Sequence, residues 1–105
     1  MPRFLAIHEF DPANIAAVLV GGGQLVEAAA RGNLPEDLNL IWAFVAYPSR
    51  PLIVGLWEAP NKEILEATFE PFKDVFKTEF HECLEVFPPG PDFVTFTNKF
   101  YTPAV

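Results

Sequence analysis

Two neighbouring stretches, residues 40–47 (LIWAFVAY) and 52–57 (LIVGLW), are apolar at almost every position. Side chains of a β-strand point alternately to opposite faces of its sheet, so a strand without polar alternates must be covered on both faces. Residues 48–51 (PSRP) join the two stretches, and so short a connection predicts a β-hairpin. This hairpin therefore needs helices, a second sheet or a ligand on each side.

The hairpin loop also predicts a register for the two strands. Continuing the pairing outward from residues 48–51 places Phe44 opposite Gly55 and Trp42 opposite Trp57. The two indoles then become cross-strand neighbours. Because Gly55 has no side chain, it leaves room for the Phe44 ring or for a ligand.

A strand and a helix are predicted before the hairpin. Residues 4–10 read as the strand, and Asp11 followed by Pro12 marks a helix start, with an N-cap oxygen and a preset φ. Apolar residues then recur at spacings of three and four as far as a C-cap at Gly32. The run Gly21–Gly23 costs roughly 1 kcal/mol per glycine in a helix, so we expect a bend or a close neighbour there.

A second helix and two further strands are predicted after the hairpin. The helix starts at Asn61 and is expected in two pieces, 61–69 and 71–76, because Pro71 disfavours helical backbone at the preceding residue. Residues 79–87 predict a fourth strand, which the prolines of residues 88–91 stop. Residues 93–101 (FVTFTNKFY) read as a fifth strand.

The element order β-α-β-β-α-β predicts an α+β, ferredoxin-like antiparallel sheet with an extra C-terminal strand. We expect strands one and three side by side and parallel, with strand four beside one and strand two beside three. The chain is expected to be one domain, 1–105, with its core in residues 3–87. The extension 88–105 could contribute to a dimer interface. Both helices cover one face, so a second copy is needed to cover the apolar side chains on the other.

The short length, the element order and Trp57-Glu58 followed by a helix resemble the dimeric α/β-barrel superfamily over residues 3–87. The resemblance implies a homodimer in which two sheets pack into a shared barrel. The superfamily includes small monooxygenases of aromatic polyketides, haem-degrading enzymes, muconolactone isomerases and ligand-binding proteins. The Asn, Trp and His set of the haem degraders is not recognisable in this sequence, and none of these activities is carried over.

Composition narrows the range of partners. The 105 residues carry 14 acidic and 7 basic side chains, a net charge of −7, which argues against nucleic acid and anionic membranes. The apolar run near the N-terminus is broken by His8 and Glu9, so we expect neither a signal peptide nor a membrane span. One cysteine, Cys83, is compatible with a reducing compartment, and a cytoplasmic location is expected.

Two histidines are the candidate catalytic residues. His8 ends strand one and His81 begins strand four, so we expect both to gather with the two tryptophans at one end of the sheet. Either could act as an acid or base, although strand-end histidines also commonly serve only as hydrogen-bonding residues. The aromatic residues that could wall a ligand cavity, or simply form the core, are Phe4, Trp42, Phe44, Trp57, Phe69, Phe72 and Phe76.

Three functions fit these features. The first is a homodimer that holds an apolar or amphipathic small molecule, such as a fatty acid or an aromatic metabolite, and could catalyse a cofactor-free oxygenation or isomerisation. The second is an oligomeric assembly module without a ligand. The third is a metal or haem site at His8 and His81, which two histidines without a local spacing motif support less well than three or four ligands would. No cofactor is expected for the first function.

Overall fold

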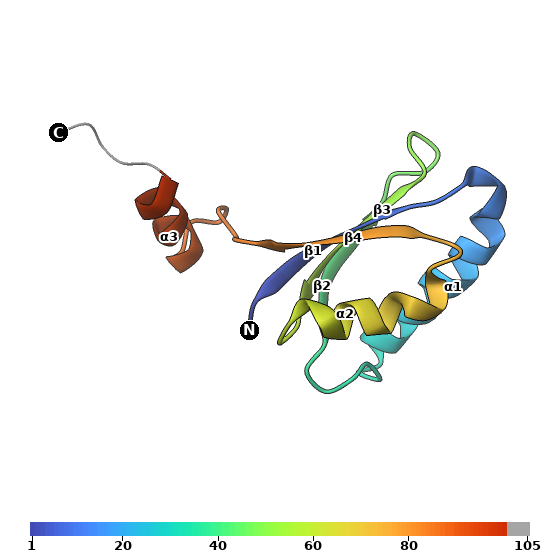
Figure 1. The fold of residues 1–105 in the computed structure, drawn as a ribbon, viewed down its shortest axis with the longest axis horizontal. Helices are drawn as coiled ribbons and strands as arrows, with labels where there is room; N and C mark the ends of the chain where they lie inside the picture. The colour runs from blue at the N-terminus through green and yellow to red at the C-terminus, as the bar shows by residue number, and fades with distance from the viewer. Residues whose placement is uncertain (101–105) are drawn as a thin grey trace.

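The computed structural model describes residues 1–100 and has the expected α+β organisation. Its elements in chain order are β1 (Arg3–Glu9), α1 (Ile15–Ala30), β2 (Asn39–Val45), β3 (Leu52–Glu58), α2 (Lys62–Phe69), β4 (Lys77–Cys83) and α3 (Pro91–Phe100). Single 3₁₀ turns precede α1 (Pro12–Asn14) and follow α2 (Glu70–Phe72). In Figure 1, α1 and α2 lie together on one face of the sheet, and α3 projects away from the end of β4.

The four strands form an open sheet in the order β2-β3-β1-β4, which is compatible with a ferredoxin-like fold. The expected neighbours are confirmed, but the expected parallel pairing of β1 and β3 is wrong, because all three strand pairs are antiparallel. The connectivity gives the reason. The α1 crossover returns β2 in the direction of β1, and the hairpin then reverses β3.

Local signals in the sequence set the helix ends. The Asp11 carboxylate accepts a hydrogen bond from the backbone N–H of Ala13, and the Asn61 side chain accepts one from Ile64, as the N-cap predictions require. Gly32 follows α1 with a φ of 70°, a conformation that favours glycine at this position. The break predicted near Pro71 is confirmed, although the second piece is a 3₁₀ turn that ends at Phe72.

The β2–β3 register differs from the predicted one. Leu40, not Trp42, lies opposite Trp57, and Phe44 lies opposite Val54. A bulge between Leu40 and Trp42 adds a further shift along the pair. Because a slip of one residue moves a side chain to the other face, Trp42 and Trp57 lie on opposite faces of the sheet.

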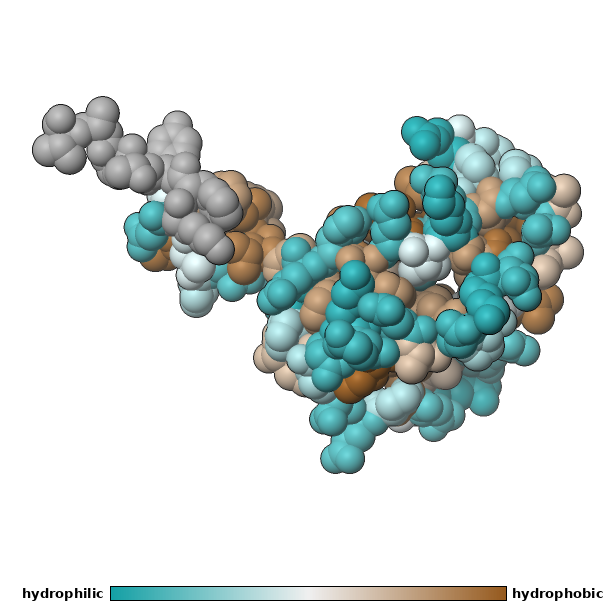
Figure 2. All heavy atoms as spheres, in the orientation of Figure 1, coloured by the Kyte–Doolittle hydropathy of each residue, from teal (hydrophilic) through white to brown (hydrophobic). Residues whose placement is uncertain are grey.

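The predicted fifth strand is wrong, because residues 91–100 form the helix α3. Pro91 presets a helical φ in the first turn, the Val94 N–H donates to the Gly90 carbonyl, and the Thr95 hydroxyl donates to the Pro91 carbonyl. β4 ends at Cys83 rather than at residue 87. The remaining predicted strand residue, 101, lies outside the described residues. Figure 2 shows apolar surface on the projecting segment, where Phe87 is 83% exposed.

The core lies between the inner face of the sheet and the helices. Its larger cluster joins β1, β3 and β4 to α2 through buried side chains that include Phe4, Trp57, Leu65 and Phe80. A smaller cluster of Phe10, Val18 and Phe76 packs α1 beside it. Phe72 contacts both clusters. The two helices therefore bury one face of the sheet, mainly over β1 and the inner part of β3.

The opposite face of the sheet, here called the outer face, is not covered by any helix of residues 1–100. Strand alternation places seven apolar side chains on the part formed by β1, β3 and β2, and the β4 edge is polar. Among them Phe44 is 67% and Trp42 is 38% exposed. The seven are Leu5, Ile7, Trp42, Phe44, Leu52, Val54 and Leu56.

Candidate functional site

A cavity of about 290 Å³ lies between α1 and the inner face of β2 and β3. We call it the α1 cavity. Val18 and Gly22 line it from the helix side, Ile53 and Trp57 line it from β3, and Phe69 closes the α2 side. Its mouth is framed by apolar side chains of α1, among which Leu19 is 64% exposed. The cavity is therefore a concave apolar site open to solvent at one side.

The glycine run of α1 explains why the cavity exists. A Cβ atom on Gly21 would lie 2.8 Å from the Phe72 ring, so the helix touches the 3₁₀ turn after α2 at this residue. A Cβ atom on Gly22 or Gly23 would meet no neighbouring atom within 4 Å. The helix stays unbroken through all three glycines, and the close neighbour expected from the sequence is Phe72. Because Gly22 and Gly23 have no side chains, they leave the space beside the helix that forms part of the cavity.

His8 lies in the floor of the cavity with only 4% of its surface exposed. Its Nδ1 is 2.8 Å from the hydroxyl oxygen of Thr78, the residue opposite it on β4. Its ring stacks against Phe69 at a centroid distance of 4.6 Å and against Phe76 at 5.3 Å. Burial among these rings lowers the pKa of His8 to about 4, so the imidazole is neutral near pH 7.

The second nitrogen of His8 faces the cavity. In the part of the chain that the structure describes, no side-chain nitrogen or oxygen is fully buried without a hydrogen-bond partner. Only Nδ1 of His8 is hydrogen-bonded, to Thr78. Nε2 must therefore keep some accessible surface, and the space that His8 lines is this cavity.

The indole N–H of Trp57 is a second polar group at the α1 cavity, and the same argument applies to it. The side chain is 3% exposed and packs edge-on against Phe69 at a centroid distance of 5.8 Å. Its Nε1 lies over Gly55, 3.1 Å from where a Cβ atom would be. Nε1 has no hydrogen-bond partner among residues 1–100, yet it is not among the fully buried unpaired atoms, so it keeps some accessible surface. Because Gly55 and Trp57 both line the cavity, we infer that the indole N–H is open to it.

The structure distributes the seven predicted aromatic residues over three places. Trp57, Phe69 and Phe76 line the α1 cavity with their rings, whereas Phe44, which also borders the cavity, points its ring to the outer face. Phe4 and Phe72 pack in the core instead. Trp42 lies on the outer face, 5.0 Å from Phe44 between ring centroids.

The predicted gathering of both histidines with both tryptophans is wrong. β4 begins at Lys77, so His81 pairs with Leu5 while His8 pairs with Thr78. The side chain of His81 is 59% exposed on the outer face and meets Glu79, on the opposite side of the sheet from His8. The two histidines therefore cannot share a metal ion or a haem. Within residues 1–100, no three His, Cys, Asp or Glu side chains are grouped so as to hold a metal ion.

Thr78 was not identified from the sequence, because the predicted fourth strand began two residues too late. Phe80, flanked by Glu79 and His81, marks the inward-facing positions of this strand, and Thr78, two residues earlier, shares its face. On that face the Thr78 hydroxyl lies directly opposite His8 on the adjacent strand and can hydrogen-bond its buried imidazole.

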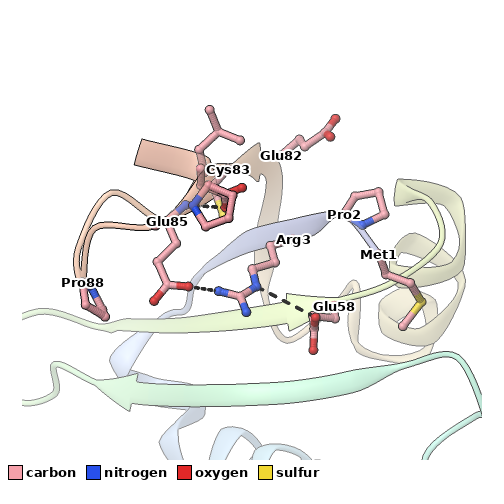
Figure 3. A pocket seen from close by; sticks show the side chains of 12 residues that line it. Met1, Pro2, Arg3, Glu58, Glu82, Cys83, Glu85 and Pro88 are labelled. Atoms are coloured by element: carbon pink, nitrogen blue, oxygen red, sulfur yellow. Dashed lines mark hydrogen bonds and ion pairs between the residues drawn. The ribbon is translucent and has the colours of Figure 1, made fainter. Parts of the chain in front are cut away.

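A second cavity, of about 450 Å³, lies where the start of β1 meets the segment between β4 and α3 (Figure 3). Arg3 points into it and pairs with the carboxylates of Glu85 and Glu58. Cys83 also lines it, and burial raises the pKa of its thiol. Because two carboxylates already compensate Arg3, its guanidinium is not free to bind an anionic ligand.

One helical stretch, Pro12–Ala30, is long and apolar enough to cross a membrane by length and composition alone, among the residues that the structure describes. Helices from the cores of globular proteins meet the same criterion. Here the stretch packs on the sheet through Val18 and on Phe72 through Gly21, and leaves Val20 and Val26 exposed. Much of its apolar surface is thus available to a ligand or a partner.

A scan against models of protein families found no match, and a search of curated proteins found none either. The assignment of a function therefore rests on the geometry of the α1 cavity.

Proposed function

We propose that this protein binds a small apolar molecule in the α1 cavity. The observation that carries the proposal is the cavity itself, about 290 Å³ of space walled by apolar side chains, in which only His8 and Trp57 have a polar side-chain atom. Ligand pockets are typically concave and apolar, with a few polar groups that fix orientation. The volume is roughly twice that of a cavity that holds benzene, which suits a molecule of about two rings.

Binding is a better proposal than turnover. A general base works best when its pKa lies near the working pH, and the pKa of His8 is lowered to about 4. No other titratable side chain among the described residues lines the α1 cavity. His81, the second catalytic candidate, is on the outer face. We therefore assign His8 a role in recognition rather than proton transfer.

Titration with naphthalene tests the proposal, using calorimetry on the full chain. The variant Gly22→Leu fills the cavity from α1, where a new side chain meets no atom within 4 Å at its Cβ. We expect this variant to stay folded and to bind at least about tenfold more weakly than the parent, a loss of about 1.4 kcal/mol. Gln24→Leu adds the same side chain to an exposed position of the same helix that does not line the cavity, and should bind like the parent.

Absence of naphthalene binding by the parent chain, or equal binding by the parent and Gly22→Leu, would contradict the proposal. A chain that binds no ligand but still self-associates would instead fit the assembly module.

We further propose that the outer face is covered by a second copy of the chain. Its seven apolar side chains form one continuous patch over β1, β3 and β2, and apolar patches of this kind mark interaction sites. The exposed rings of Phe44 and Trp42 lie within it. The same face in a second copy is equally apolar, so a two-fold pairing of the two faces satisfies both copies at once.

The proposed setting is the cytoplasm. Cys83 is the single cysteine of the sequence, which suits a reducing compartment. The net charge of −7 disfavours nucleic acid and anionic bilayers as partners. Self-association and a small apolar ligand are thus the partners that we propose.

A further inference from the structure

We infer that the α1 cavity selects an uncharged apolar molecule carrying a hydroxyl or carbonyl oxygen, which His8 and Trp57 bind at the cavity floor. This inference rests on the proposed binding function and specifies its ligand. The two side chains are each more than nine-tenths buried, yet each presents one nitrogen to the cavity without a protein partner.

The two side chains share a neighbour on the cavity wall. Both rings pack against Phe69, which His8 meets at 4.6 Å and Trp57 at 5.8 Å between centroids. The Trp57 Nε1 reaches back over Gly55, whose direct neighbour on β1 is Ala6, two residues from His8. The backbone positions of diagonal neighbours are about 7 to 8 Å apart across a sheet, which aromatic side chains can span, so the imidazole and the indole can both approach the polar end of one ligand.

The hydrogen-bonding capacity of the pair sets the chemistry of the ligand. The indole N–H is a donor only. When Nδ1 of His8 donates to the Thr78 oxygen, Nε2 is an acceptor, and the pair offers one donor and one acceptor. That combination matches a hydroxyl group. When Thr78 donates instead, Nε2 carries the proton and both groups donate, which matches a carbonyl oxygen.

Charge excludes the alternative of a carboxylate at the floor. None of the described residues that line the cavity is a lysine or arginine, and His8 is neutral near pH 7. Burying a carboxylate without a cation costs several kcal/mol. A carboxylate could bind only with its charged group at the open mouth, away from His8 and Trp57.

Three probes with the same ring system test the inference: naphthalene, 2-naphthol and 2-naphthoate, each titrated at pH 7 by calorimetry. We expect 2-naphthol to bind about three- to tenfold more tightly than naphthalene, as one or two neutral hydrogen bonds allow. We expect 2-naphthoate to bind more weakly than naphthalene. 2-Acetylnaphthalene in the same series separates a carbonyl from a hydroxyl preference.

Two variants remove the polar atoms and keep the site apolar. His8→Leu and Trp57→Phe should each lose the preference for 2-naphthol over naphthalene, while naphthalene itself still binds. Thr78→Val is a milder change that leaves both cavity nitrogens in place and frees the imidazole tautomer, so it should weaken the preference without removing it.

The outcomes distinguish the inference from the proposed function. If naphthalene binds but 2-naphthol binds no better, or if the preference survives both variants, the inference is overturned and the proposed function stands. If none of the probes binds, both fall.

Discussion

Nδ1 of His8 lies 2.8 Å from the hydroxyl oxygen of Thr78, directly across the antiparallel pair of β1 and β4. The ring is otherwise enclosed by Phe69, Phe76 and Phe80. A histidine held in this way is favoured in its neutral form, because protonation would place a charge among aromatic rings with one hydroxyl as its only partner.

The stability of the fold should therefore fall as the pH falls from 6.5 toward 4. The folded-state pKa of His8 is about 4, against 6.5 for an unperturbed histidine, so the unfolded chain binds the proton first. The linked loss of unfolding free energy between pH 7 and pH 5 is about 2 kcal/mol. Urea unfolding at the two pH values measures it.

Two glutamine variants isolate this contribution. His8→Gln should remove most of the pH-dependent loss, whereas His81→Gln, exposed on the outer face, should retain it. An equal loss in the parent and in His8→Gln would show that other groups cause the pH dependence.

Neighbouring glycines of α1 should respond in opposite ways to alanine. Gly22→Ala adds a methyl group into open space and should stabilise the fold by about 0.5 to 1 kcal/mol, because alanine favours the helix. Gly21→Ala would place its Cβ 2.8 Å from the Phe72 ring, which packs against both core clusters. Displacing that ring should make Gly21→Ala less stable than Gly22→Ala by about 1 to 2 kcal/mol.

Thermal unfolding of the two variants side by side gives the comparison. If both substitutions stabilise the chain equally, α1 does not rest on Phe72 at Gly21, and the account of the cavity wall is wrong.

The sequence was informative where one local cause decides the structure. The caps at Asp11 and Asn61, the helix end at Gly32 and the break at Pro71 were all predicted, because each depends on a single side chain or on a backbone restriction. The element order then led to the correct strand neighbours.

Features that depend on register were not predictable in this way. The hairpin pairs Val45 with Ile53, one residue away from the predicted register, and this slip moves Trp42 and Trp57 to opposite faces. An all-apolar strand carries no clear signal for the slip or for the bulge beside Leu40. The predicted proximity of His8 and His81 was wrong because β4 begins two residues earlier than the sequence had indicated. Residues 93–101 combine strand-forming residue types with a helical spacing of Phe93, Phe96 and Phe100. The structure has a helix there, and it begins at Pro91, whose fixed φ suits a first helical turn.

The two tryptophans should differ in their access to a soluble quencher. Trp57 is 3% exposed within the cavity, and Trp42 is 38% exposed on the outer face. With Val54→Lys added to keep two outer faces from pairing, acrylamide should thus quench the Trp57→Phe variant, which keeps Trp42, more strongly than Trp42→Phe. Adding Gly22→Leu should further protect Trp57, because the new side chain fills the cavity, and should leave Trp42 unchanged. Protection of neither indole by Gly22→Leu would indicate that quencher reaches Trp57 by another path.

The outer face provides a test of self-association. Val54 lies on the middle strand of the apolar patch, paired with Ile7 on one side and Phe44 on the other. Val54→Lys would bury an unpaired ammonium group if two outer faces meet, which is costly enough to dissociate the pair. Sedimentation equilibrium at micromolar concentration should show a dimer for the parent and a monomer for Val54→Lys. Gln24→Lys, which adds the same charge to the exposed surface of α1, should remain dimeric. A folded parent chain that sediments as a monomer throughout this range would mean that water tolerates the exposed face, and the proposed pairing would have to be abandoned.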